Sequence, residues 1–185
     1  MKQKSMAVYC GHQFGNNADF KRDAVRVGQL MAKDKIKLVF GGGDVGLMGA
    51  VATAVAENGG KVIGVSTEHV SARQEPLHEH TAIEIEIVKG VNERKQRMYG
   101  LSDAFCILPG GIGTLNELTD IMTMQQIGES KKPIYFLNTA GYWDIFGHTM
   151  THMMREGFVE SFDNYNIQVF NTPEEVLQEY LKYKA

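Results

Sequence analysis

The segment Leu108–Glu117 (LPGGIGTLNE) has the composition of a phosphate-binding turn. Its three glycines follow a short apolar run and precede a helical pattern. Glycines let backbone N–H groups converge on an anion, and a helix N-terminus adds partial positive charge. Thr114 contributes a hydroxyl, and Glu117 places a carboxylate near whatever the phosphate carries. A glutamate here also stabilises the helix dipole by about 0.3–1 kcal/mol, so this segment alone leaves both interpretations open.

A second glycine-rich segment, Gly41–Gly49 (GGGDVGLMG), follows an earlier apolar run. It fits the G-x-G-x-x-G pattern of dinucleotide-binding turns, which also require an acidic residue about twenty positions later, at the end of the next strand. The next strand-like run ends at Ser66-Thr67, with Glu68 only just beyond. Two phosphate-type turns at the carboxyl ends of parallel strands meet at one crevice, which favours a mononucleotide site over an NAD site.

Two adjacent cations, Arg94 and Lys95, begin a helical pattern in the segment Val91–Met98 (VNERKQRM). Such a pair usually belongs to a solvated helix face. Here the preceding strand-like run ends near Val88, which predicts that both cations share the carboxyl edge of the sheet with the glycine turns. Arginine suits bidentate contact with phosphate or ribose hydroxyls, and lysine supplies a point charge.

Together these three segments resemble the LONELY GUY family, whose signatures are a GGGxxGLMG loop, an RKxxM helix start and PGGxGTxxE. The resemblance runs from about Val8 to Phe158. Members of this family are phosphoribohydrolases that cleave nucleoside 5′-monophosphates, including cytokinin precursors and often AMP, into free base and ribose 5-phosphate. The resemblance implies an N-glycosidic hydrolase without a cofactor. The alternative is a non-catalytic protein that binds or carries a nucleotide or cofactor on the same fold.

By this resemblance Arg94 and Glu117 are the catalytic pair, in which Glu117 stabilises an oxocarbenium-like sugar and Arg94 orients it. The resemblance further implies that Lys95 neutralises the 5′-phosphate. The residues implied in nucleotide binding are Gly42, Gly43, Met48, Glu75, Lys95, Gly110, Gly111, Ile112, Gly113, Thr114, Leu115, Asn116 and Thr123. The first loop departs from the family pattern, with His12-Gln13 in place of two small hydroxyl residues. Glu75 and His12 are the candidates for a general acid.

Short apolar runs alternate with helical patterns, which predicts a doubly wound parallel α/β sheet of the Rossmann-like type with helices on both faces. The predicted strands are Met6–Tyr9, Lys37–Phe40, Lys61–Ser66, Ile83–Val88, Ala104–Leu108, Pro133–Leu137 and Ile167–Phe170. The predicted helices are Ala18–Lys33, Leu47–Glu57, Asn92–Leu101, Thr114–Ile127, Trp143–Arg155 and Glu174–Tyr180, the last opened by a Thr172–Glu175 capping box. The stretch Thr67–Thr81 shows no periodicity and indicates a lid, a binding loop or an unrecognised short helix.

The 185 residues, 43% of them hydrophobic, suffice for one domain, which we expect to span residues 1–185. The formal charge of −3 argues against binding to nucleic-acid polymers or anionic membranes, and a four-residue apolar run near the N-terminus is too short for a signal peptide. We therefore expect a cytoplasmic protein. Both cysteines, Cys10 and Cys106, lie in or next to strand-like runs and are expected to be reduced core thiols.

Two further patterns carry expectations about metals and partners. His148 and His152 stand at helical spacing i, i+4 but lack the glutamate of H-E-x-x-H and an evident third ligand, so no metal site is expected. Apolar residues occur around most of the Thr114–Ile127 helix. We expect Met122, Met124 and Ile127 to lie at the interface of a homodimer or a higher homo-oligomer, close to the active site, as in the family.

Overall fold

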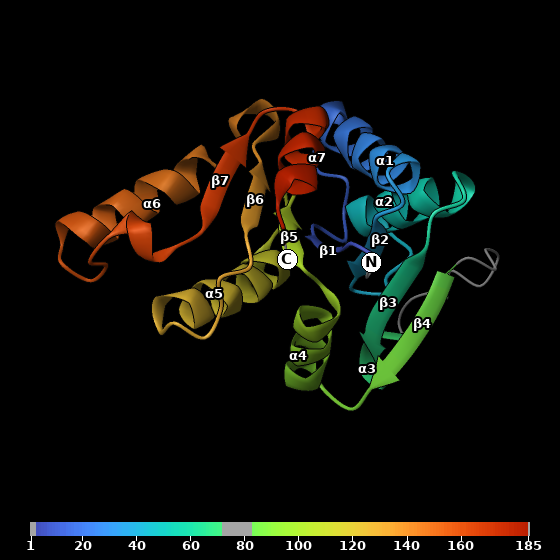
Figure 1. Cartoon of the computed structure of the whole chain (residues 1–185), viewed down its shortest axis with the longest axis horizontal. Helices are drawn as coiled ribbons and strands as arrows, with labels where there is room; N and C mark the ends of the chain where they lie inside the picture. Colours follow the sequence, from blue (N-terminus) through green and yellow to red (C-terminus); the bar gives the residue numbers. More distant parts are fainter. Residues whose placement is uncertain (1–2, 72–82, 185) are drawn as a thin grey trace.

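A computed structural model describes residues 3–71 and 83–184. Within these ranges seven strands form one parallel sheet in the order β4-β3-β2-β1-β5-β6-β7 (Figure 1). The strands are β1 (Ser5–Tyr9), β2 (Lys37–Phe40), β3 (Val62–Thr67), β4 (Ile83–Val88), β5 (Ala104–Ile107), β6 (Ile134–Leu137) and β7 (Ile167–Phe170). The fold predicted from the alternating pattern, a doubly wound parallel sheet, is confirmed.

Helices cover both faces of this sheet. Those described are α1 (Ala18–Lys33), α2 (Gly46–Glu57), α3 (Glu68–Ser71), α4 (Val91–Leu101), α5 (Ile112–Gln126), α6 (Asp144–Arg155) and α7 (Pro173–Lys182), with the 3-10 turns η1 (Thr139–Gly141) and η2 (Phe162–Asn164). Residues of α1, α2 and α7 pack into one apolar core, and residues of α4, α5 and α6 pack into the other. Each core belongs to one side of the sheet.

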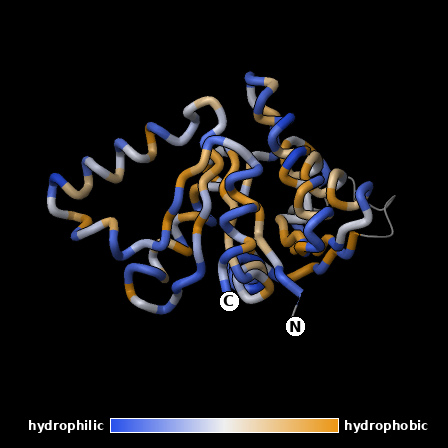
Figure 2. Tube along the Cα trace, turned by 45° about the horizontal axis from the view of Figure 1, so that its top comes forward, coloured by the Kyte–Doolittle hydropathy of each residue, from blue (hydrophilic) through white to orange (hydrophobic). Residues whose placement is uncertain are grey.

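The alternation of side chains along the central strands divides the two cores. Met6 and Val8 of β1 point into the first core, whereas Ala7 and Tyr9 point into the second. In Figure 2 the central strands are largely hydrophobic, while the surrounding helices alternate hydrophobic and hydrophilic residues. A sheet covered on both faces needs apolar residues at every strand position, which explains why the strands appear in the sequence as short continuous apolar runs.

Most element boundaries match the sequence-based prediction to within two residues. The predicted capping box of α7 is present, with the Thr172 hydroxyl accepting from the Glu175 backbone. Helix α5 begins at Ile112 instead of Thr114, because Gly111 takes the N-cap position, so Glu117 lies in the second turn of the helix and not the first. The unperiodic stretch contains the short helix α3, and its remainder lies largely outside the described residues.

The chain changes direction across the sheet between β1 and β5. From β1 the strands are added toward β4, and from β5 they are added toward β7 on the other side. The loops after β1 and β5 therefore diverge, which is where doubly wound sheets open a crevice. Gly11 joins these loops, since its N–H donates to Pro109 O at 3.0 Å and its carbonyl accepts from Leu47 N at 3.1 Å.

No helix among the described residues is long and apolar enough to cross a membrane. Cys10 and Cys106, which both fall in the described ranges, are buried free thiols, as expected. Both side chains belong to the core under α1, α2 and α7. Burial raises the pKa of the Cys106 thiol to about 12, so this thiol stays protonated and is a poor nucleophile.

Candidate functional site

Arg94 connects three elements at the carboxyl edge of the sheet. Its Nε donates to Val65 O of β3 at 2.8 Å, and its Nη2 donates to Gly41 O in the turn after β2 at 3.3 Å. Its Nη1 donates to Glu117 Oε1 of α5 at 3.0 Å. Only 15% of the Arg94 side chain is exposed. The guanidinium is therefore held by two fixed carbonyls and presents its remaining edge to the carboxylate.

Glu117 is a buried carboxylate on the second turn of α5. Its side chain is 10% exposed, and its recorded partner is the Arg94 guanidinium. Burial raises the pKa of Glu117, while the charge and hydrogen bond of Arg94 pull that pKa down. The pKa of Glu117 remains raised overall, and the Arg94 charge is what favours the ionised carboxylate that could meet a developing positive charge.

A second ion pair runs beside the first, between the same two helices. Lys95 Nζ lies 2.6 Å from Asp120 Oδ2, with Lys95 14% exposed and Asp120 45% exposed. The Lys95–Asp120 pair borders a cavity of about 260 Å³, whose wall also includes Tyr9 and Glu117. Burial, and after it the charge of Glu117, raises the pKa of Tyr9 well above its usual range, which keeps this phenol protonated. Lys95 thus lies with Asp120 in this cavity and is not among the residues that line the cavity at the glycine turn after β5.

The glycine turn after β5 has one packed glycine and two open ones. A Cβ on Gly110 would overlap with the hydroxyl of Thr114. Thr114 is 3% exposed and packs against the turn. At Gly111 and Gly113, in contrast, no heavy atom of the described residues lies within 4 Å of the position a Cβ would take. Space for an anion is thus kept in front of the first turn of α5.

A cavity of about 250 Å³ opens at this turn, between the loops that follow β1 and β5. Gly110 and Gly111 form one side, and the first loop contributes His12 and Gln13. Aromatic side chains from three segments close the rest: Phe14, Phe20 and Tyr142. The histidine and amide that distinguish this chain's first loop therefore border the same crevice as the open glycines.

The glycine turn after β2 is filled by the protein itself. A Cβ on Gly41 would overlap with the Arg94 guanidinium and lie 3.2 Å from Met48 Sδ, and one on Gly42 would lie 2.9 Å from Ser66 Cβ. Gly42 and Gly46 have positive φ angles of 79° and 62°, which glycine adopts without strain. This turn therefore packs around the Arg94 guanidinium and helps to hold it in place.

Most of the remaining binding residues predicted for α5 lie on its outer side, whereas Leu115 packs against the core shared by α4, α5 and α6. Ile112 is 81% exposed, Asn116 is exposed and Leu115 is half-buried. Thr123 is exposed and its hydroxyl donates to Thr119 O at 2.8 Å, on the helix surface and not on the walls of the two cavities described above. Gly43 is buried in the turn after β2. Glu75 lies outside the described residues.

Met122 of α5 and the two histidines of α6 were also singled out in the sequence. Met122 is 6% exposed and belongs to the core under α5, so the expectation that it lies at a subunit interface is wrong. His148 and His152 are exposed on α6, and His152 Nδ1 lies 2.7 Å from Arg155 Nη2. Across the described ranges, no three side chains of His, Cys, Asp or Glu are grouped so as to hold a metal ion.

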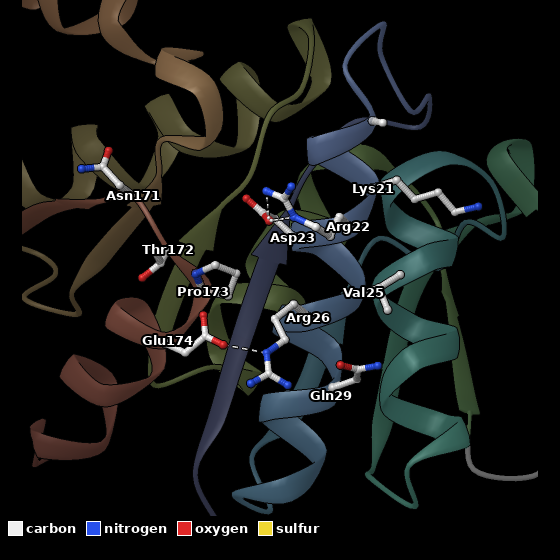
Figure 3. A pocket seen from close by; sticks show the side chains of 11 residues that line it. Lys21, Arg22, Asp23, Val25, Arg26, Gln29, Asn171, Thr172, Pro173 and Glu174 are labelled. Atoms are coloured by element: carbon white, nitrogen blue, oxygen red, sulfur yellow. Dashed lines mark hydrogen bonds and ion pairs between the residues drawn. The ribbon is translucent and has the colours of Figure 1, made fainter.

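A larger groove, of about 750 Å³, lies between α1 and the start of α7 (Figure 3). Arg26 Nε contacts Glu174 Oε1 at 2.6 Å across it, and Arg22 Nη2 contacts Asp23 Oδ1 at 3.0 Å. These charges are paired on the groove surface, and neither glycine turn contributes to its wall.

Residues of this site that sequence reasoning missed include Tyr9, Tyr99, Asp120 and Tyr142. For Asp120 a signal existed. Glu117 and Asp120 stand three residues apart and so share one face of a predicted helix. Arg94 and Lys95 are adjacent on another predicted helix, so the two helices offer two pairs of opposite charges. Tyr142 donates to Gly110 O at 2.6 Å. Its partner is a backbone carbonyl, which carries no side-chain signal.

Residues 48–180 match a family model described as "Possible lysine decarboxylase". The chain is 40% identical over 159 residues to the cytokinin riboside 5′-monophosphate phosphoribohydrolase LOG of Oryza sativa subsp. japonica, covering 84% of this chain and 64% of that protein. It therefore spans slightly less than two thirds of the rice relative. A cytokinin riboside 5′-monophosphate phosphoribohydrolase of Rhodococcoides fascians is 37% identical over 156 residues, covering 84% of this chain and 78% of that protein.

Solved structures with the same fold include two proteins whose titles name the molybdenum cofactor. The molybdenum cofactor binding protein of Rippkaea orientalis has a TM-score of 0.69 at 22% identity, covering 98% of both chains. The Moco carrier protein of Chlamydomonas reinhardtii has a TM-score of 0.68 at 19% identity, covering 98% of this chain and 97% of that one. At these identities the likeness concerns the fold alone.

Proposed function

We propose a hydrolytic function for this chain, which belongs to the LONELY GUY family of phosphoribohydrolases: cleavage of the N-glycosidic bond of a nucleoside 5′-monophosphate into free base and ribose 5-phosphate. AMP and N6-substituted AMP, the cytokinin riboside monophosphates, are the proposed substrates. We propose that residues 1–185 act as one nucleotide-binding domain in the cytoplasm. The observation that carries this proposal is the buried Arg94–Glu117 pair beside an open glycine turn.

The pair suits the chemistry of glycosidic hydrolysis. As the bond from C1′ to the base nitrogen breaks, its electron pair leaves with the base and positive charge develops on C1′ and the ring oxygen. A carboxylate held next to these atoms lowers the energy of that state, and Glu117 also accepts a hydrogen bond from a ribose hydroxyl or the attacking water. Arg94 holds Glu117 in place and limits its protonation. Water then bonds to C1′ and loses a proton to the solvent, and the departing base takes up one proton to become the free base.

In this proposal the 5′-phosphate contributes most of the binding energy of the substrate. Gly111, Gly113 and the N-terminus of α5 offer backbone donors with no side chain in front of them among the described residues. Ribose then lies toward Glu117, a turn and a half along the same helix. In this geometry the base lies toward the cavity bordered by Tyr9, Lys95 and Asp120.

Incubation of the purified protein with a panel of nucleosides and nucleoside monophosphates tests the proposal. Free base should appear from AMP or its N6-substituted analogues, and far more slowly from adenosine, because the phosphate contributes the binding energy. Equal rates on AMP and adenosine contradict the phosphate assignment. Absence of base from every monophosphate contradicts the hydrolase.

A nucleotide or cofactor carrier on the same fold is the alternative function. The neighbours named for molybdenum cofactor binding share the fold with this chain, so the fold itself is compatible with a carrier. A carboxylate next to a bound anion weakens binding, however, so a carrier gains nothing from Glu117. Tight nucleotide binding without base release, measured by calorimetry and chromatography on the same sample, would favour the carrier.

Lysine decarboxylation, the activity in the family model's description, needs a lysine bound to pyridoxal phosphate. Lys33 and Lys61 are exposed on the surface. Lys132 Nζ donates to Tyr99 O at 2.8 Å and lies 3.7 Å from the centroid of the Tyr99 ring. A phosphoribohydrolase accounts for the Arg94–Glu117 pair, and decarboxylation does not.

We propose that the protein is a homodimer or a higher homo-oligomer with α5 near the interface and the active site close to the partner. Ile112 is 81% exposed and Ile127 is 61% exposed, so apolar side chains stand free at both ends of α5. Light scattering should give at least a dimer mass at micromolar concentration. Ile127→Asp should lower that mass, whereas Ile145→Asp on α6, where the isoleucine is 74% exposed, should leave it unchanged.

A further inference from the structure

Tyr142 stands between η1 and α6 and reaches back to the glycine turn after β5. Its hydroxyl donates to Gly110 O at 2.6 Å. Its ring meets Phe20 of α1 edge-on, with centroids 5.5 Å apart, and meets Trp143 edge-on at 5.0 Å. Two perpendicular aromatic contacts fix the direction of the ring, so the hydroxyl reaches one backbone carbonyl and not a range of acceptors.

The loop that carries Tyr142 is itself held in place. Thr139 Oγ1 of η1 donates to the buried carboxylate of Asp23 on α1 at 2.7 Å. Asn138 Oδ1 accepts from the Trp143 backbone N–H at 2.8 Å. Ala140 has a positive φ of 53°, a conformation that costs energy in a residue with a Cβ and persists where surrounding contacts over-determine it.

The hydrogen bond from Tyr142 acts on the peptide unit that joins Gly110 to Gly111. In a trans peptide the carbonyl and the following N–H point in opposite directions within one plane. Holding Gly110 O toward Tyr142 therefore holds the Gly111 N–H away from it. Glycine residues on both sides offer little steric resistance to rotation of this unit, so an external hydrogen bond decides its orientation.

Gly111 is the N-cap of α5, and a Cβ there would meet no heavy atom of the described residues within 4 Å. Its N–H is one of the donors that a helix start offers to an anion. We propose that Tyr142 is a positioning residue: its hydroxyl locks the Gly110–Gly111 peptide so that the Gly111 N–H stays directed at the phosphate of the substrate. This inference rests on the proposed function of the turn as the phosphate site.

Tyr142→Phe removes the hydroxyl and keeps the ring contacts. Loss of one hydrogen bond that orders a donor should weaken binding of ribose 5-phosphate roughly 3- to 10-fold by calorimetry. KM for AMP should rise by the same factor with kcat nearly unchanged, while the rate on adenosine should stay at the wild-type value. In ¹⁵N spectra the Gly111 amide should shift on adding ribose 5-phosphate to the wild type, and shift less in the variant.

Tyr165→Phe is the matched control, because the Tyr165 hydroxyl donates to the exposed Gln126 side chain at 3.4 Å and borders neither cavity described at the glycine turn or at Glu117. It should bind ribose 5-phosphate as the wild type does. Equal affinity of wild type and Tyr142→Phe, with AMP still cleaved, overturns the role of Tyr142 and leaves the hydrolase standing. Weakened binding in the variant, in a protein that releases no base, supports Tyr142 and overturns the hydrolase. A wild type that binds no ribose 5-phosphate overturns the assignment of the turn as the phosphate site, and with it the role of Tyr142, while base release still decides the hydrolase.

Discussion

The two glycine turns look alike in sequence but differ in what occupies the space beside their glycines. After β2, the places that side chains would take are filled by the Arg94 guanidinium at Gly41 and by the backbone of His12 at Gly46. After β5, the described residues leave the corresponding places at Gly111 and Gly113 empty. The first turn uses glycine so that the protein packs against itself, and the second uses glycine so that something else approaches.

This difference separates two meanings of a glycine-rich motif. A glycine whose missing Cβ is replaced by protein atoms is required for folding, whereas one that faces open space is free for binding. The first turn then serves the site indirectly, by holding Arg94 through Gly41 O. The comparison predicts that substitutions in the first turn damage stability, and that substitutions in and after the second turn damage binding and catalysis.

The largest effect is expected at Glu117, on the helix that the second turn opens. Glu117→Gln keeps the shape and removes the charge, so turnover of AMP should fall roughly 10²- to 10³-fold if the carboxylate stabilises positive charge. Nucleotide binding should persist or tighten. Glu86→Gln, which removes a half-buried carboxylate paired with Arg97, is the control and should retain full turnover. Near-normal turnover in Glu117→Gln would leave this residue with a helix-dipole role alone.

In the first turn, Gly46→Ala should destabilise the fold. Gly46 has a φ of 62°, and an added Cβ would overlap with the backbone of His12. The left-handed conformation and the overlap together should cost about 2–4 kcal/mol, which lowers the midpoint of thermal unfolding by roughly 5–15 °C. Thermal unfolding followed by circular dichroism measures this. An unchanged unfolding midpoint would contradict the claim that the glycines of the first turn are required for stability.

In the second turn, Gly113→Ala should leave the stability of the fold intact and weaken phosphate binding. Alanine is a better helix former than glycine, and nothing in the described part of the chain obstructs its methyl group, so the unfolding midpoint should hold or rise slightly. A methyl group in the anion site should weaken ribose 5-phosphate binding roughly tenfold, equivalent to about 1.4 kcal/mol. Calorimetry and thermal unfolding on the same sample check both halves. Full affinity would show that phosphate binds elsewhere.

The smallest effect is a displacement of the pH profile. Burial raises the pKa of Glu117, so base release should fail on acidification at a higher pH than an ordinary glutamate would dictate. Arg94 lowers this pKa, so in Arg94→Gln the Glu117 carboxyl, followed by ¹³C NMR, should titrate at still higher pH. By linkage, a raised folded-state pKa stabilises the protein below the unfolded-state pKa of Glu117, and this contribution is lost as pH rises through the folded-state value.

The fold was largely predictable from the sequence because strand and helix patterns are local. The convergence of Arg94 with Glu117 followed from two parallel strands ending at one edge, supported by a family resemblance. The outward face of α5 did not follow, because its apolar residues surround most of the helix and periodicity alone does not say which side packs. For that reason Met122 was assigned to an interface and lies in the core. Pairings with backbone groups, such as that of Tyr142, leave no pattern in a sequence.

The reversal of strand order between β1 and β5 also affects how the molecule folds. These two strands are neighbours in the sheet but lie far apart in the chain. Their contact closes a long loop: Ser5 N donates to Asp103 Oδ2 at 3.1 Å across 98 residues. Closing so long a loop delays folding, since its entropic cost precedes the contacts that offset it. The crevice exists once both halves have docked, so phosphate binding should be among the last properties recovered on refolding and a sensitive reporter of the complete native state.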